Sequence, residues 1–423
     1  MNNGVPCLFG DVFFYAFLQN TWFDEGRIYM GSSDVLFLML GAVMILSMHA
    51  GFAFLEAGTV SRKNQVNALN KIIVDWSIST VVYFIAGFPL AYGVMLYTNP
   101  ALFTLNNGYA LVRFFFLTGF AACVPAIISG GVVGRMKFFA QSIACIILVT
   151  LVYPFFEGLV WGRISFMGQA GSFFQTIFGI PFHDYAGSVV VHSIGGWIAL
   201  PAIFLLGPRI GRFKGNFDTR PSSIPFLSLG SWILVVGWFG FNVMSAQKLD
   251  NISGLVVINS LMAMAGGTLS GFLFSRNDTG FTHNGALAGL IAICAGSDVV
   301  HPLAALFIGA AAGFIFIKLY DFETKKLKID DVLGVWPLHG VNGTWGGIAA
   351  GIFGRKFFGG AYDLSFFSQL TGSLLAVVYA LAAGFIIYKV IDKIYGLRVT
   401  PHEEMIGLDL TFHKIESNPD QSL

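Results

Sequence analysis

Two histidines stand at matching positions in this sequence, and paired imidazoles are suited to handling protons. Asp184 precedes His192 by eight residues, and Asp331 precedes His339 by the same distance. Imidazole donates or accepts a hydrogen bond and titrates near neutral pH, and two rings that share a hydrogen bond titrate as a unit. Each ring could instead be a packing histidine satisfied by a local hydroxyl or carbonyl. The matching positions favour a shared role.

The two aspartates also have a simpler interpretation as helix caps. A carboxylate at a helix start accepts hydrogen bonds from free backbone amides and lies at the positive end of the helix dipole. For Asp331, capping is a sufficient explanation. For Asp184, capping and a role beneath the mouth of a conduit are equally open.

The composition indicates that lipid surrounds most of this chain. Hydrophobic residues make up 55% of the 423 residues, charged residues make up 11%, and the mean hydropathy is +0.72, values unlike those of a soluble domain. A net charge of +1 provides no field that would attract nucleic acid. The sequence has no zinc-type cysteine spacing and no phosphate-binding glycine loop, so we expect neither a metal nor a cofactor.

Apolar runs long enough to cross a membrane recur along the whole chain. A helix needs about 20 apolar residues to cross the hydrocarbon core of a bilayer. Eleven runs are candidates, and the eighth is unusually short: 34–58, 73–97, 109–133, 139–161, 184–207, 224–246, 253–275, 283–298, 301–320, 331–353 and 364–390. The sequence therefore predicts an all-α polytopic membrane protein with eleven transmembrane helices.

The matched histidines predict an internal repeat. They lie in the fifth and tenth runs, which would cross the membrane in opposite directions, as in an inverted 5+5 repeat with one appended helix. Eight residues at 1.5 Å rise place each histidine about 12 Å along its helix from its aspartate, one measured from each side of the membrane. Both imidazoles should therefore meet near the midplane, where an ionisable group normally faces a cavity or the bundle interior.

The distribution of basic residues predicts the orientation of the chain. Loops after the odd-numbered runs, together with the C-terminal tail, hold 18 of the 24 lysines and arginines, and the opposite side holds 6. By the positive-inside rule, the N-terminus lies outside the cell membrane and the tail is cytoplasmic. We expect an extracellular segment (1–33), a first repeat (34–207), a cytoplasmic linker (208–223), a second repeat (224–353), helix 11 (354–390) and a cytoplasmic tail (391–423).

Five ordered motifs resemble one known family. The sequence is similar to the ammonium transporter (Amt/Rh) family from the first apolar run to the tail. The motifs that carry this resemblance are Gly51-Phe-Ala-Phe-Leu-Glu-Ala-Gly58, Ser61-Arg-Lys-Asn64, Asp184-Tyr-Ala-Gly187 with His192, Gly237-Trp-Phe-Gly-Phe-Asn242 and His339-Gly-Val-Asn-Gly343. The resemblance implies a homotrimer in the lipid bilayer, in which each protomer has its own pore and recruits ammonium from outside.

The resemblance also implies which residues form the site. It implies an outer ammonium-binding site at Phe120, Trp161 and Ser245, with Asp184 holding the vestibule polar. It implies a gate of stacked rings, Phe120 above Phe241, with the pore residues His192 and His339 below. The residue types fit, because aromatic faces attract a cation and a hydroxyl accepts its N–H. Without the family, each aromatic would be an ordinary core residue.

The expected mechanism separates ammonium from potassium by deprotonation, because the two ions have similar size and charge. We expect the vestibule to concentrate ammonium, a proton to leave near the two phenylalanines, and ammonia to pass the histidine pair, which could also relay the proton. Pro125 could kink the third run below Phe120. Glu157, one turn before Trp161, either tunes cation recruitment or is a capped or snorkelling carboxylate.

Other functions remain open at this stage. The tail reads Thr400-Pro-His-Glu-Glu-Met-Ile-Gly-Leu-Asp409 and resembles the family's segment for contacts with neighbouring protomers and nitrogen-signalling regulators. Its ending, Lys414-Ile-Glu-Ser-Asn-Pro-Asp420, departs from the family pattern. The alternative function is an ammonium sensor that signals through this tail. A channel for neutral ammonia or carbon dioxide is a close variant of the transporter hypothesis. A membrane enzyme is disfavoured, because no nucleophile or metal-ligand spacing accompanies the histidines.

Overall fold

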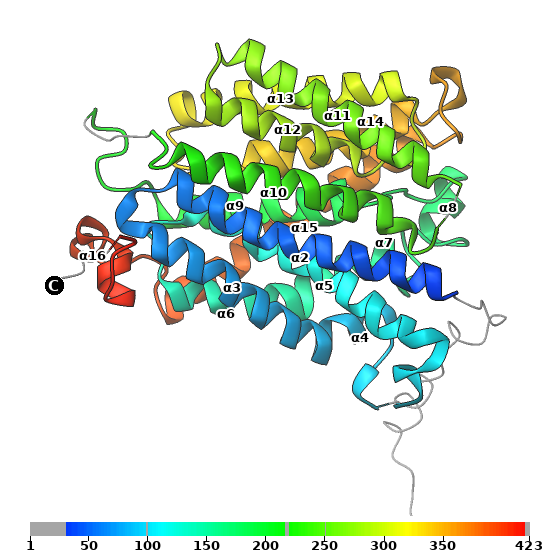
Figure 1. Ribbon diagram of the computed structural model, residues 1–423, viewed down its shortest axis with the longest axis horizontal. Helices are drawn as coiled ribbons and strands as arrows, with labels where there is room; N and C mark the ends of the chain where they lie inside the picture. The colour runs from blue at the N-terminus through cyan, green and yellow to red at the C-terminus, as the bar shows by residue number, and fades with distance from the viewer. Residues whose placement is uncertain (1–30, 99, 216–219, 250, 419–423) are drawn as a thin grey trace, which may run out of the picture.

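The computed structural model describes residues 31–98, 100–215, 220–249 and 251–418, and this part of the chain is helical. The long helices run side by side and form one bundle (Figure 1). Among the described residues there is no β-strand, only an isolated bridge between Met136 and Arg398. The α-helices are α2 (Ser32–Thr59), α3 (Gln65–Val82), α4 (Phe88–Tyr92), α5 (Tyr109–Val132), α6 (Phe138–Ile147), α7 (Tyr153–Val160), α8 (Phe173–Phe178), α9 (Ile194–Leu206), α10 (Ile224–Val243), α11 (Ser253–Phe274), α12 (Thr279–Ile293), α13 (Pro302–Phe322), α14 (Asn342–Phe353), α15 (Phe366–Ile394) and α16 (Pro401–Ile406).

Several of these helices continue through a π-helical turn instead of ending. Such turns occur mostly inside α-helices and at functional sites. One turn joins α3 to α4, another joins α6 to α7, and two more lead into α9 and α14. The π-helical turns are η2 (Tyr83–Gly87), η6 (Leu148–Val152), η7 (Ser188–Ser193), η9 (Glu323–Leu327), η10 (Trp336–Val341) and η12 (Asp409–His413).

Nine helical stretches of the described chain are long and apolar enough to cross a membrane. They are Ser32–Thr59, Arg62–Tyr92, Leu105–Val132, Phe138–Val160, Ser188–Leu206, Ile224–Ala246, Ser253–Phe274, Pro302–Leu327 and Phe366–Ile394. The runs expected at 283–298 and 331–353 correspond to α12, with 15 residues, and to η10 followed by α14. These two segments are not among the nine. The helical membrane fold is confirmed for the described residues, while the count of eleven helices and the 5+5 repeat stay predictions.

Some helices begin or end at other residues than the apolar runs predict. Helix α3 begins at Gln65 instead of near 73, so Lys71 lies inside a helix and not in a loop. Lys71 is 3% exposed and pairs with Glu56 of α2, with 3.5 Å between Nζ and Oε1. A buried partner allows a charged side chain to lie within a membrane helix. Helix α15 likewise ends at Ile394, so the tail begins after 394 and not at 391, and the N-terminal segment expected over 1–33 falls mostly outside the described residues.

The C-terminal tail docks onto the start of α3. The carboxylate of Asp409 accepts hydrogen bonds from the backbone amides of Val66 (3.0 Å) and Asn67 (2.8 Å). These amides belong to the first turn of α3, whose own N-cap residue provides no side-chain cap. In return, Lys63 donates to the carbonyls of Glu404 and Met405 at the end of α16. The tail therefore completes a helix terminus that would otherwise lack partners.

A charged cluster surrounds Asp330 at the same end of the bundle. The guanidinium of Arg209 donates to both Asp330 oxygens, at 2.8 and 2.7 Å, and Arg212 donates to one of them at 3.0 Å. The buried Arg135 donates to the Asp330 carbonyl at 2.6 Å. Burial by itself would raise the pKa of Asp330, but the hydrogen bonds and charges of Arg209 and Arg135 hold that pKa well below its usual value.

Candidate functional site

The two histidines come into direct contact in the centre of the bundle. His192 lies in η7 and His339 lies in η10, and the two Nδ1 atoms are 3.3 Å apart. The rings are 0% and 3% exposed. One Nδ1 must donate the hydrogen and the other must accept it, so the tautomers of the two rings are coupled. The expected meeting of the imidazoles is therefore observed.

Each histidine turn starts from an aspartate cap. The Asp184 carboxylate accepts hydrogen bonds from the backbone amides of Gly187 (2.9 Å), Val189 (2.8 Å) and Val190 (2.8 Å). The Asp331 carboxylate accepts one from the amide of Trp336 at 2.8 Å. Capping, one of the two alternatives for Asp184, thus describes its carboxylate in this structure. The group fixes the start of the turn that carries His192.

Two glycines allow the histidine segments to cross in backbone contact. A Cβ atom added to Gly196 would lie 2.1 Å from the backbone nitrogen of Gly340, and one added to Gly343 would lie 2.3 Å from the carbonyl oxygen of Ser188. Real Cβ atoms do not approach other atoms so closely, so any larger residue would push the segments apart. Small residues at helix contacts are the usual means of close packing in membranes.

A hydroxyl group fastens this crossing on one side. The Thr344 hydroxyl of α14 lies 2.9 Å from the Ser193 hydroxyl and accepts a hydrogen bond from Trp197 Nε1 at 3.0 Å. Ser193 directly follows His192 in the sequence, and Trp197 lies on α9. The crossing is therefore held by backbone contact and by a side-chain hydrogen bond, and both keep the two imidazoles at hydrogen-bonding distance.

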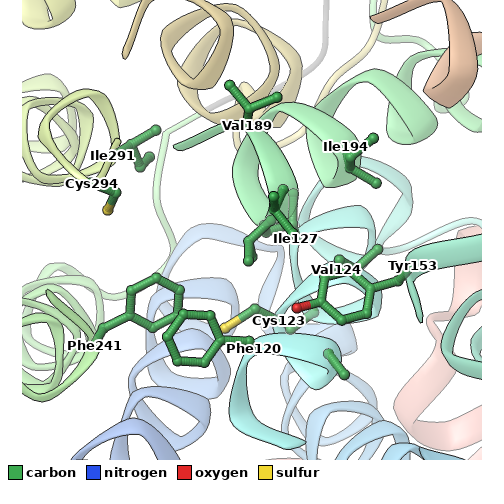
Figure 2. Packing of buried hydrophobic residues seen from close by; sticks show 14 of the residues in the cluster. Phe120, Cys123, Val124, Ile127, Tyr153, Val189, Ile194, Phe241, Ile291 and Cys294 are labelled. Carbon is green, nitrogen blue, oxygen red and sulfur yellow. The ribbon is translucent and has the colours of Figure 1, made fainter. Parts of the chain in front are cut away.

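Two phenylalanine rings stack next to the histidine pair. Phe120 of α5 and Phe241 of α10 lie with their ring centroids 3.9 Å apart and their planes within 15° (Figure 2). Both are fully buried, and the Phe241 ring centroid is 5.6 Å from that of His192. Trp161, at the C-cap of α7, meets the Phe120 ring edge-on at 5.7 Å. The structure thus brings Trp161, the two phenyl rings and the two histidines into one continuous series of ring contacts.

The other expected site residues contact this series through hydrogen bonds. Trp161 Nε1 donates to the carbonyl of Asp184 at 2.6 Å, so the indole is held by the same residue that caps the His192 turn. The Ser245 hydroxyl donates to the carbonyl of Phe241 at 2.8 Å, one turn earlier. Its oxygen keeps lone pairs that can accept a hydrogen bond from a ligand.

Sequence reasoning missed two residues that support His192. Trp238 of α10 stacks on the imidazole, with ring centroids 5.2 Å apart and planes 25° apart. Its Nε1 donates to the Cys294 sulfur at 3.2 Å. Trp238 precedes Phe241 by three residues, which places both on one helix face, so the helical spacing could have identified it. Nothing in the sequence indicated Cys294.

The arrangement favours neutral species over ions. Aromatic faces attract a cation at Trp161 and Phe120, but the ring neighbours of the histidines are Trp238, Phe241 and Phe52, and a bare ion there would lose hydration that these rings do not replace. Within the described ranges, no group of three or more His, Cys, Asp or Glu side chains is arranged to hold a metal ion. The residue types therefore suit cation attraction at the aromatic end of the series and hydrogen bonding at its imidazole end.

Fold and site together define a polytopic membrane protein with an aromatic and imidazole centre. Comparison with known proteins gives the family: the model of the Ammonium Transporter Family matches residues 36–417. The chain belongs to the ammonium transporter family, whose members are integral membrane transporters or channels rather than enzymes.

Relatives and solved structures agree with this family. The chain is 42% identical over 407 residues to ammonium transporter Amt2 of Methanocaldococcus jannaschii, covering 93% of each chain. It is 33% identical over 423 residues to ammonium transporter Amt2 of Archaeoglobus fulgidus, covering 92% of this chain and 88% of the relative. Among solved structures, a sensor Amt protein matches with a TM-score of 0.80 at 32% identity, over 90% of this chain and 98% of its own. Mep2 of Candida albicans shares the fold, with a TM-score of 0.76 at 21% identity over 89% and 88% of the chains.

Proposed function

We propose that this protein moves ammonium across the cell membrane by removing a proton from it and conducting ammonia past the histidine pair. Ammonium would be recruited at Trp161, Phe120 and Ser245, and would lose its proton at the gate formed by Phe120 and Phe241. The observation that carries this proposal is the 3.3 Å contact between His192 and His339 next to the stacked phenyl rings.

Deprotonation provides the selectivity in this proposal. Potassium and ammonium have similar size and charge, so an aromatic site attracts both. Only ammonium can give up a proton and enter a dry passage as a neutral molecule, because the free energy of moving a bare ion into a low-dielectric interior is prohibitive. The coupled imidazoles offer either a donor or an acceptor to the passing ammonia. They also provide a route for the proton, which would make transport electrogenic.

The proposal includes the arrangement of the protein in the membrane. We infer eleven transmembrane helices, with α12 and the segment from η10 to α14 as short spans, related as a 5+5 inverted repeat with α15 appended. The aspartate, π-helical turn and histidine that recur in the two segments support the repeat. The start of α2 and the docked α16 lie at opposite ends of the bundle (Figure 1), which supports an outer N-terminal segment and a cytoplasmic tail. The assembly is proposed to be a homotrimer.

A second function, sensing, is favoured by one specific observation. The described chain matches a sensor Amt protein over 98% of the length of that structure, at 32% identity. The docked tail offers a route for a signal, because Asp409 and Lys63 join the tail directly to the ends of α2 and α3. In this alternative, ammonium binds at the same aromatic site without being transported, and a cytoplasmic nitrogen-signalling partner reads the position of the tail.

Proteoliposomes distinguish these functions. Purified protein is reconstituted into vesicles, and the current after an ammonium concentration jump is recorded on a solid-supported membrane. Electrogenic transport predicts a current that decays faster at higher protein density, because a faster flux fills the vesicles sooner. A sensor predicts saturable binding of ammonium with a charge displacement whose decay does not depend on protein density. A channel for neutral ammonia predicts a change in internal pH without current.

A matched control separates the transported species from ionic strength. Potassium at the same concentration should give no current, since potassium cannot lose a proton. Empty vesicles in the same ammonium gradient measure the passive entry of ammonia. The proposal is contradicted when protein-containing and empty vesicles give the same current and the same internal pH change.

A further inference from the structure

A second buried charge lies close to the gate, in a place the mechanism above does not use. Glu157 belongs to α7, and its side chain is 0% exposed. It lies one helical turn before Trp161, whose backbone amide donates to the Glu157 carbonyl at 2.7 Å. Four residues of helix correspond to about 6 Å along the axis. The carboxylate therefore sits beside the aromatic end of the site but does not open into it.

Tyrosine hydroxyls surround this carboxylate. The Tyr83 hydroxyl donates to Oε1 and Oε2, at 3.0 and 2.9 Å, and the Tyr92 hydroxyl donates to Oε1 at 2.9 Å. Both tyrosines are fully or almost fully buried. Hydroxyl donors on both oxygens favour the ionised form of a carboxyl group, and charge-assisted hydrogen bonds are about twice as strong as neutral ones. The cage formed by Tyr83 and Tyr92 can therefore stabilise a negative charge on Glu157 out of water.

A third tyrosine lies on the same helix as Glu157. Tyr153 begins α7 one turn before Glu157, and its hydroxyl has no hydrogen-bond partner among the described residues. In Figure 2 this hydroxyl points toward Cys123, which follows Phe120 by three residues on α5. The helix that carries Glu157 therefore packs next to α5, the helix that carries the gate ring Phe120.

The positive charge of Arg113 partly balances the negative charge of Glu157. The Arg113 guanidinium lies over the Tyr92 ring, 4.4 Å from its centroid. Arg113 stands seven residues before Phe120 on α5, about 10 Å toward the helix start, so the positive charge lies farther along the helix than the gate. Glu157 and Arg113 form a dipole across the Tyr92 ring with its negative end next to the gate.

We propose that Glu157, hydrogen-bonded by Tyr83 and Tyr92, is the residue that sets the affinity of the outer site for ammonium, through the field of a buried negative charge. The proposal rests on the proposed function, because it assumes a cation at Trp161 and Phe120. Glu157 acts as a positioning residue: it does not touch the cation. The Asp184 carboxylate, by contrast, is occupied as the cap of the turn that carries His192.

The test separates affinity from turnover. The substitution Glu157→Gln keeps the shape of the side chain and removes the charge, and currents are recorded over a range of ammonium concentrations. We expect the half-saturating ammonium concentration to rise at least about tenfold, the size expected for one charge roughly 12 Å away at an effective dielectric constant near 20. The maximal current should stay within about twofold of the wild type, because the histidine pair is unchanged. Glu157→Asp, which keeps the charge, should restore most of the affinity.

The matched control is Asp363→Asn. Asp363 is an exposed carboxylate in the loop before α15, with a side chain that is 58% exposed, and its charge is screened by water. We expect its half-saturating concentration to stay within about twofold of the wild type. Wild-type affinity in Glu157→Gln, or a loss of maximal current without a change in affinity, would overturn the inference in favour of a purely structural cage.

Two further measurements keep the inference testable. When Glu157→Gln yields no folded protein, the double variant Tyr83→Phe/Tyr92→Phe carries the test: a carboxylate without donors takes up a proton, so the same tenfold weakening is expected, and unchanged affinity overturns the inference. When the wild type gives no current, the proposed transport fails, while the Glu157 inference is read from ammonium binding to the purified protein by tryptophan fluorescence. There, equal affinity in wild type and Glu157→Gln contradicts it.

Discussion

The two histidine segments share a backbone arrangement but differ in their surroundings. In both, an aspartate caps a π-helical turn, the turn carries the histidine, and glycines follow. In the His192 segment, Asp184 accepts three backbone hydrogen bonds. In the His339 segment, Asp331 accepts one, and its Oδ1 has no hydrogen-bond partner among the described residues. The His339 segment instead follows Asp330, which is paired with Arg209 and Arg212.

Repeated sequence segments can therefore share one geometry and still be supported in two ways. The His192 turn is fixed by its own aspartate, which also orients Trp161 through its carbonyl. The loop before the His339 turn is anchored by ion pairs, chiefly between Asp330 and Arg209. The glycine contacts at the crossing are common to both segments. Substitutions should therefore lower stability and activity most at the crossing, less at the Asp184 cap and least in the loop that holds Asp330.

The largest effect is expected at the crossing itself. Gly196→Ala would place a methyl group within 2.1 Å of the backbone of Gly340, and overpacking of this kind costs about 3 kcal/mol or more. We expect the variant to lose ammonium current and to melt at a lower temperature in detergent. Gly254→Ala is the matched control, because its added Cβ meets nothing within 4 Å. A Gly196→Ala variant with wild-type melting and wild-type current would contradict the proposed contact.

Substitution of Asp184 should destabilise the protein more than substitution of Asp331. Asp184→Ala leaves three backbone amides without their acceptor and should lower the free energy of unfolding by about 3 kcal/mol. Asp331→Ala removes the acceptor of a single backbone amide, that of Trp336, and a loss of about 1 kcal/mol is expected. Thermal melting of the two variants in the same detergent measures the difference. Equal destabilisation would show that the two segments do not differ in support as described.

The stability of the folded protein should depend on pH through the Asp330 carboxyl group. The pKa of this carboxyl is lowered in the folded protein, so its ion pairs contribute full stability at pH values above the unfolded pKa, near 3.9. That contribution is lost as the pH falls through the folded value, and it amounts to roughly 2 kcal/mol. The stability gap between wild type and Asp330→Asn should therefore be constant from pH 7 to pH 5 and narrow below about pH 4. A gap that widens on acidification would refute the assignment.

Much of the fold and part of the site follow from the sequence alone. Apolar runs are local features of the sequence, and they identify the helices. The eight-residue spacing from aspartate to histidine is also local, and it predicts that His192 and His339 meet. The start of α3 could not be predicted, because its first amides are capped by Asp409, which is more than 300 residues away in the sequence. The same limitation applies to Glu157, whose partners come from separate helices.

Residue types also leave roles undetermined until the packing is known. Asp184 was compatible with capping and with a place at the pore mouth, and only the three amide contacts show what its carboxylate binds. Cys294 lies in an apolar run of the sequence, yet its sulfur accepts a hydrogen bond from Trp238, the residue that stacks on His192. Hydrogen bonds between helices depend on how each helix is rotated about its axis and how deep it lies in the bundle. The local sequence determines neither.

The measurement that tests the central claim most directly is the ratio of potassium to ammonium current in His192→Ala and His339→Ala proteoliposomes. The account predicts that the wild type conducts ammonium and excludes potassium. It also predicts that each alanine variant either loses the ammonium current or begins to admit potassium, since one imidazole alone cannot maintain the shared hydrogen bond. Wild-type ammonium flux with full exclusion of potassium in both variants would contradict the role of the histidine pair.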